Sequence, residues 1–386
     1  MSRVKSSLVA FCRKEKVLLI AFVCAVISCF FIHPSSDYKD YIDFRTLGLL
    51  FCLMTISSGL ELCGFTAKTA SFLMNRCKST VTSIPVLVAL PFFASMLITN
   101  DVALIAFVPF SIAVMRLMNS SNLIIPVVIL QTLAANLGSM ATPIGNPQNL
   151  YIQSFYNLSA GEFFKIVLPY TFVSLIFLIG ASIVVGFSGR KNTSLPSADT
   201  RTSAGSMEGS TVKNPKLVMI ICLVLFVLCL MSVFNVLSWI ILPPLILVCF
   251  LCAAPGALKK VDYFLLLTFV CFFIFAGNIG EDGEVKSFVS DLLSKNTFFV
   301  SLGLSQVISN VPAAALLSNF TDNSRDLMLG TDIGGLGTPI ASLASLISYK
   351  LYMSCEDSKS GKYLLFFEIA NILMLIVLVI EKLILS

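Results

Sequence analysis

The stretch 97–110, LITNDVALIAFVPF, decides the fold because the chain contains its pattern twice. An apolar run leads to the polar triplet TND at 99–101, and a second apolar run follows it. Near the other end, 304–320 reads LSQVISNVPAAALLSNF, with SNV at 309–311 in the same place. Small polar motifs repeated inside apolar sequence are typical of a membrane transport site built from an internal repeat.

A glycine-rich Thr-Pro segment follows each copy of the pattern. The first, GSMATPIGNP, occupies 138–147, and the second, GGLGTPIAS, occupies 334–342. The asparagines of the two triplets are 210 residues apart, and the two Thr-Pro threonines are 196 residues apart. The similar offsets predict that the two halves of the chain share one architecture.

Composition places this repeat in a bilayer. Of 386 residues, 57% are hydrophobic and 12% are charged, and the mean hydropathy is +0.92. A soluble domain needs more charge than this, so we expect an integral membrane protein with the lipid bilayer as its surroundings. No basic run interleaved with aromatics suggests nucleic-acid binding. The single histidine, His33, and the scattered cysteines argue against an enzyme and against a cofactor.

The fold class that we expect is an all-α polytopic membrane protein with an inverted repeat. Residues 1–43 would form an N-terminal transmembrane helix and an exterior loop, and 44–187 the first repeat. The Ser/Thr/Gly-rich segment 188–214 would be a flexible cytoplasmic linker. Residues 215–386 would form the second repeat. The distribution of Lys and Arg predicts a cytoplasmic N-terminus and an exterior C-terminus.

Each repeat should contain a re-entrant helical hairpin followed by a broken transmembrane helix. The hairpins would cover about 84–118 and 296–320, and the broken helices about 123–158 and 327–352. The arms of the first hairpin, at about four turns each, should be too short to cross a hydrocarbon core of about 30 Å. We therefore expect both hairpins to enter and leave the membrane on one side, and the second repeat to be inverted.

Backbone groups freed at a helix break must face protein, water or a ligand, because lipid cannot satisfy them. Around a pseudo-twofold axis, the two hairpin tips and the two Thr-Pro breaks would meet near the midplane. Helix N-termini there suit carboxylates or oxyanions, while freed carbonyls and polar side chains suit sodium. The cation-binding residues that we predict are Thr99, Asn100, Gly138, Ser309, Asn310 and Gly337.

Two carboxylates in the apolar segments are candidates for coupling. Asp101 ends the first triplet, and Asp332 takes the position that Asn136 holds in the first repeat. Intramembrane carboxylates often mark cation or proton paths. No Lys or Arg lies within a triplet or a Thr-Pro segment, so dipoles, amides and a co-bound cation would meet the charge of an anion.

At these motifs the chain resembles the ion transporter superfamily, which includes arsenite permeases, D-type sodium/proton antiporters, citrate-transporter-like permeases and divalent anion/sodium symporters. The resemblance covers nearly the whole chain. It implies an elevator transporter with a scaffold and a transport domain, forming a homodimer in the plasma membrane. The substrate-binding residues that we expect, in large part from this resemblance, are Thr99, Asn100, Asp101, Thr142, Pro143, Asn310, Val311, Thr338 and Pro339.

The sequence thus predicts a secondary active transporter that couples a small anion, such as a di- or tricarboxylate, to sodium or protons by alternating access. One alternative is a sodium/proton antiporter or an arsenite-type oxyanion exporter that uses Asp101. Another is a passive ion channel. Asp101 has no acidic counterpart at Val311, so the site would be asymmetric.

Overall fold

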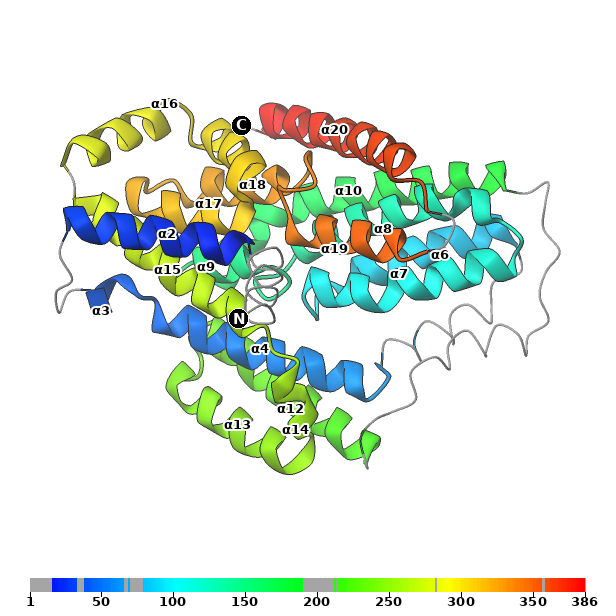
Figure 1. The fold of residues 1–386 in the computed structure, drawn as a ribbon, viewed down its shortest axis with the longest axis horizontal. Coiled ribbons are helices and arrows are strands. Elements are labelled where there is room, and N and C mark those ends of the chain that lie inside the picture. The colour runs from blue at the N-terminus through cyan, green and yellow to red at the C-terminus, as the bar shows by residue number, and fades with distance from the viewer. Residues whose placement is uncertain are drawn as a thin grey trace, which may run out of the picture.

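The computed structural model of the chain is helical throughout the part that it describes, and no strand occurs there (Figure 1). The all-helical, polytopic part of the predicted fold class is confirmed. The described residues are 16–32, 38–65, 69, 79–189, 212, 214–281, 283–355 and 358–385. The predicted linker 188–214 and the basic N-terminal segment therefore lie almost wholly outside the described residues.

Two series of helices follow each other along the chain. The first half contains α2 (Lys16–Phe31), α3 (Tyr38–Tyr41), α4 (Phe44–Leu62), α6 (Thr80–Ala94), α7 (Asn100–Leu117), η1 (Ser121–Leu123), α8 (Ile124–Ser139), α9 (Pro147–Phe155) and α10 (Ala160–Ser188). The second half contains α12 (Pro215–Val233), η3 (Trp239–Ile241), α13 (Leu242–Ala253), α14 (Pro255–Lys259), α15 (Tyr263–Glu281), α16 (Gly283–Ile308), α17 (Asn310–Leu317), η4 (Ser318–Phe320), α18 (Ser324–Gly334), α19 (Leu343–Met353) and α20 (Ser360–Leu385).

Seven helical segments in the described part are long and apolar enough to cross a membrane: α4, α7, η1 with α8, α10, α12, α15 and α20. The apolar side chains of α10 and α20 point outward in large number, for example Phe172 and Leu365, which are 64% and 60% exposed. Such surfaces are stable in lipid and not in water. The chain is therefore an integral membrane protein.

The first hairpin consists of α6 and α7, which pack against each other and against α8 (Figure 1). It begins at Thr80, four residues before the predicted start, because Ser79 and Thr82 form a capping box there. α7 has 18 residues, about 27 Å at 1.5 Å per residue. The expectation of two four-turn arms is wrong for α7, which continues through Pro109 for five turns.

The second hairpin is separated from the preceding helix by a kink. The span of α16, Gly283 to Ile308, consists of two helices that meet at a kink, where Asn296 has non-helical angles, φ −165° and ψ 87°. The Asn296 side chain accepts a hydrogen bond from the backbone N–H of Phe299, at 3.1 Å, and so caps the arm that follows. The second hairpin is therefore 297–308 with α17, and it joins them through Ser309 at φ 76°.

Each Thr-Pro segment interrupts a helix, at the predicted positions. The first break, 140–146, separates α8 from α9, and the second break, 335–342, separates α18 from α19. Pro147 stands at the start of α9, where a missing N–H costs nothing. Gly337 in the second break has φ +98°, a conformation open to glycine and strained for other residues.

The two halves are packed into each other. α7 of the first half contacts α19 of the second, and α17 of the second contacts α9 of the first. In each pair, the helix that follows the hairpin tip of one half lies against the helix that follows the break of the other half. The core between the two halves is therefore built from both.

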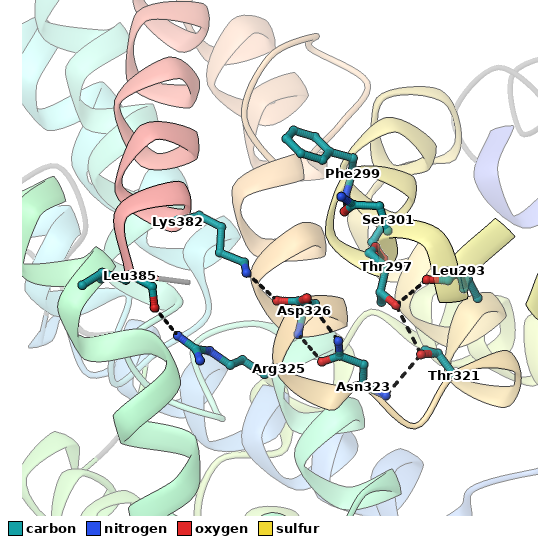
Figure 2. Close-up of polar contacts among 11 residues, drawn as sticks. Leu293, Thr297, Phe299, Ser301, Thr321, Asn323, Arg325, Asp326, Lys382 and Leu385 are labelled. Atoms are coloured by element: carbon teal, nitrogen blue, oxygen red, sulfur yellow. Dashed lines mark hydrogen bonds and ion pairs between the residues drawn. The ribbon is translucent and has the colours of Figure 1, made fainter. Parts of the chain in front are cut away.

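The C-terminal end of α20 is fixed to the start of α18, as Figure 2 shows. Lys382 forms an ion pair with Asp326 at 2.9 Å, and Arg325 donates to the backbone carbonyl of Leu385 at 3.4 Å. Asn323 caps α18 by accepting from the Asp326 N–H at 3.1 Å. These contacts hold the entry of the second broken helix against the last helix of the chain.

Candidate functional site

Each hairpin tip is held to the break of its own half by one backbone hydrogen bond. The N–H of Asn100 donates to the carbonyl of Gly145 at 3.3 Å, and the N–H of Asn310 donates to the carbonyl of Ala341 at 3.0 Å. The donors are 210 residues apart and the acceptors 196 residues apart. The offsets found in the motifs thus reappear in the contacts.

The Thr-Pro threonines make a second matched contact. The hydroxyl of Thr142 donates to the carbonyl of Met96 at 2.7 Å, and the hydroxyl of Thr338 donates to the carbonyl of Gln306 at 3.2 Å. Both predicted substrate hydroxyls thus tie a break to a hairpin arm in this conformation. Pro143, which follows the first, is buried, and Pro339, which follows the second, is half-buried. Substrate contact by these four residues stays a prediction.

Glycines allow the breaks to approach the hairpins closely. A side chain at Gly138 would overlap the carbonyl oxygen of Phe92. A side chain at Gly334 would lie 2.8 Å from the Cβ of Ser305 and 3.0 Å from the Cα of Leu302. Gly138 and Gly334 are equivalent by the offset of 196, and the residues that they contact are equivalent by the offset of 210.

Each tip asparagine is the first residue of its helix, and its side chain accepts a hydrogen bond from the next backbone N–H. The side-chain oxygen of Asn100 accepts from the Asp101 N–H, and that of Asn310 accepts from the Val311 N–H, both at 2.9 Å. Both asparagines are buried. Ser309 at the second tip donates to the carbonyl of Ala341 at 3.2 Å. The contacts of the predicted cation-binding residues therefore fall into two groups, one at each tip.

Thr99 and Asp101 at the first tip line a cavity of about 530 Å³. Two residues of the broken helices, Pro147 of α9 and Ile347 of α19, also line it. Its remaining wall is formed by α4 and by the turn from α14 to α15. The residues that this turn contributes are Lys259, Lys260, Val261, Asp262, Tyr263, Phe264 and Leu265.

Lys259 and Lys260 are residues that the sequence did not assign to the site. No basic residue lies in a tip or a break. The fold nevertheless brings this pair to the cavity, although it lies more than 150 residues after the first tip in the sequence. Lys260 also pairs with Glu61 of α4 at 2.9 Å. No local signal could have placed them, because two lysines beside Pro255 and Asp262 have the composition of an ordinary loop.

Two clusters of side chains join the halves behind the tips. In the first, Asn136 of α8 accepts hydrogen bonds from Asn100 at 3.2 Å and from Ser342 at 3.1 Å. Its amide group donates to Ser345 at 3.3 Å. The sequence identified Asn136 only as the counterpart of Asp332. The spacing of residues along the chain could not predict its position at the junction of the two halves.

The second cluster surrounds Asp332 of α18, which is 6% exposed. Gln148 of α9 donates to one of its carboxylate oxygens at 3.1 Å, and the side chains of Asn146 and Asn149 lie beside the same carboxylate. The two candidate coupling carboxylates are thus in different places, because Asp101 lines the cavity and Asp332 lies within the interface of the halves.

An integral membrane protein whose helices break in its interior, beside a cavity lined by residues of both halves, has the architecture of a membrane transporter. Comparison with known proteins defines the class further. The sequence model of the citrate transporter family matches residues 8–330. The chain belongs to this family, within the ion transporter superfamily that its motifs resemble.

Proteins with sequences similar to this chain include transporters and a membrane protein. An uncharacterized transporter of Methanocaldococcus jannaschii is 32% identical over 88% of this chain and 89% of its own length. The inner membrane protein YbiR of Escherichia coli is 29% identical over 86% of each chain. The silicon efflux transporter LSI3 of Oryza sativa subsp. japonica is 33% identical over 36% of this chain and 28% of its own length.

Proposed function

We propose that this protein is a secondary active symporter that couples the movement of a small anion, a di- or tricarboxylate, to sodium or protons. The anion would bind in the cavity beside the first tip. The name of the matching family supports a carboxylate substrate. The observation that carries the proposal is the chemistry of the cavity wall.

That wall combines three sources of positive potential. Thr99 and Pro147 stand at the N-termini of α7 and α9, where helix dipoles and free N–H groups favour anions. Lys259 and Lys260 add two basic side chains. A volume of about 530 Å³ lies within the range of about 300–1,000 Å³ that is usual for small-molecule sites.

The same wall contains Asp101 and Asp262. Carboxylates beside an anion site repel the anion unless a cation or proton neutralises them. Binding of the anion would then be favoured when the coupling ion is present, and this is the condition that a symporter needs. Only the first tip has an acidic residue, Asp101, where the second has Val311. This difference is consistent with an anion site at the first tip.

Alternating access would follow from the matched halves. The tip-to-break contacts are repeated at constant offsets, which supports a repeat whose two copies exchange conformations. We propose that the second copy is inverted, that the hairpins and broken helices move as an elevator, and that the protein is a homodimer of the plasma membrane. Lys259 and Lys260 would face the cytoplasm under the positive-inside rule, so the cavity beside them would open inward.

Uptake by proteoliposomes tests the proposal. The purified protein is reconstituted, and labelled citrate or succinate is supplied under a sodium gradient, a proton gradient or neither. We expect accumulation above the outside concentration under one of the two gradients. Entry that only equilibrates would indicate a channel, and absence of carboxylate uptake under both gradients would reject the proposal.

The second candidate is an antiporter or an oxyanion exporter that uses Asp101. The position of Asp101 beside Asp262 in the cavity favours it, as does the partial similarity to a silicon efflux transporter. Arsenite and silicic acid belong in the same assay for this reason. Sodium movement coupled to protons without any anion would select the antiporter.

A further inference from the structure

The cluster around Asp332 contains three buried oxygen atoms without a hydrogen-bond partner. They are Oδ2 of Asp332, Oδ1 of Asn146 and Oδ1 of Asn149. The three residues are 6%, 3% and 0% exposed. Buried polar atoms in native proteins are nearly always paired, and three unpaired acceptors in one cluster therefore point to a missing positive partner.

The first half provides an internal comparison. By the offset of 196, Asp332, Asn146 and Asn149 are equivalent to Asn136, Ser342 and Ser345. In that equivalent cluster the Asn136 oxygen receives two hydrogen bonds and the amide group donates one. The same backbone arrangement thus permits complete pairing, and the unpaired oxygens result from the three different side chains in the second cluster.

No basic side chain of the described residues forms an ion pair with Asp332. The donors around its carboxylate are all neutral: Gln148 at 3.1 Å and the side-chain amides of Asn146 and Asn149. A buried carboxylate without a counter-charge is unfavourable. A single proton would satisfy one of the three acceptors. A metal cation would contact all of them once the amides of Asn146 and Asn149, which lie beside the carboxylate, turn their oxygens toward it. Carboxylate and amide oxygens are hard ligands, which suit sodium.

We propose that a sodium ion binds between Asp332, Asn146 and Asn149, at the junction of α18 with the N-terminus of α9. This site differs from the cation residues expected at the tips. Pro147, between Asn146 and Gln148, lines the cavity of the first tip, so sodium bound here would order the wall of the proposed anion site. The inference rests on the proposed function in one respect, since it makes this ion the coupling ion.

Thermal unfolding of the full-length protein in detergent tests binding without transport. Melting temperatures are measured in sodium chloride and in choline chloride at equal ionic strength. A ligand that binds only the folded state raises the melting temperature, so we expect sodium to stabilise the wild type. Asp332→Asn, which copies the first half's Asn136, should reduce the sodium-dependent shift by about fivefold or more.

Two further variants make the test specific. Asp326→Asn removes the same charge from the same helix, but at its outer end, where Asp326 pairs with Lys382. It should keep the full sodium-dependent shift. Asn149→Ser, which copies Ser345, should reduce the shift without changing charge. Asn149→Ser also keeps the inference testable if Asp332→Asn does not fold.

Three results would overturn the sodium site. They are no sodium-dependent shift in the wild type, an unchanged shift in Asp332→Asn or Asn149→Ser, and an equal loss in Asp326→Asn. Stabilisation that follows pH and ignores sodium would assign the carboxylate to a proton instead. Transport separates the two proposals. Sodium-driven citrate uptake that persists unchanged in Asp332→Asn rejects the site alone, whereas sodium binding without any carboxylate uptake rejects the symporter alone.

Discussion

Asn100 and Asn310 have two contacts in common, and these fix the two tips. The backbone N–H reaches the carbonyl of the break, and the side-chain oxygen accepts the next N–H of the helix. These contacts therefore hold the helix start in place, so that the positive end of the helix dipole lies at the tip.

Asn310→Ala should abolish citrate uptake while leaving expression intact. Removing the side chain deletes two hydrogen bonds, from the Val311 N–H and from the Ser309 hydroxyl, at a cost of about 1–2 kcal/mol to stability, and it releases the start of α17. Uptake in proteoliposomes and the elution profile of the detergent-purified protein measure the two effects. Normal uptake in this variant would remove Asn310 from the site.

Asn323→Ala is the matched control for that variant. Asn323 also accepts a backbone hydrogen bond at the start of a helix, from the Asp326 N–H, but it is exposed, and its amide group donates to the Asp326 carboxylate (Figure 2). We expect a similar loss of stability, about 1 kcal/mol, with uptake retained. The comparison separates loss of a helix cap from loss of the site.

At this scale the sequence predicted the asparagines and missed their partners. A polar triplet in an apolar run is visible locally, since lipid does not tolerate unpaired polar groups. Ser342 and Ser345, which hold Asn136, are more than 200 residues away from it. Their role depends on packing between the halves, which spacing along the chain does not reveal.

Among the elements, the breaks have the strictest space requirement. Gly138→Ala should destabilise the protein by about 1–3 kcal/mol or more, because the new methyl group would overlap the Phe92 carbonyl. The melting temperature in detergent measures this effect. Gly180→Ala is the control, because nothing lies within 4 Å of a side chain at that position in α10. It should be neutral or stabilising by up to about 1 kcal/mol. Equal effects of the two substitutions would contradict the close approach.

Helix breaks were predictable, and helix ends were less so. Glycines and prolines in 138–147 and 334–342 stop a helix by covalent geometry, so the sequence located both breaks. The start of the first hairpin depended on a capping box at Ser79, and the length of α7 depended on its packing against α8 and α19. In a uniformly apolar stretch, the periodicity of hydrophobic residues carries little information on where a helix starts or how long it is.

For the whole molecule, we propose that the cavity between the first tip and the α14–α15 turn decides the substrate. Lys259→Gln should raise the half-saturation concentration for citrate by about three- to tenfold, since it removes one positive charge from the cavity wall. Initial uptake rates over a range of citrate concentrations measure this. A neutral substrate would show no such change.

Lys295→Gln provides the control for Lys259→Gln. It removes the same charge from an exposed pair with Asp291 on α16, away from the cavity of the first tip. Its half-saturation concentration should equal that of the wild type, because exposed pairs are screened by solvent. An equal rise in both variants would show that net charge, and not the cavity, governs uptake.

The interlocked packing has a consequence for biosynthesis. Asn136 and Gln148 belong to the first half, but their side-chain partners Ser342, Ser345 and Asp332 emerge from the ribosome 184 to 209 residues later. Until then the membrane must hold buried amides that have not met their partners, which is costly in hydrocarbon. The first half can therefore be inserted early, but it reaches its final packing only after α18 and α19 have been synthesised.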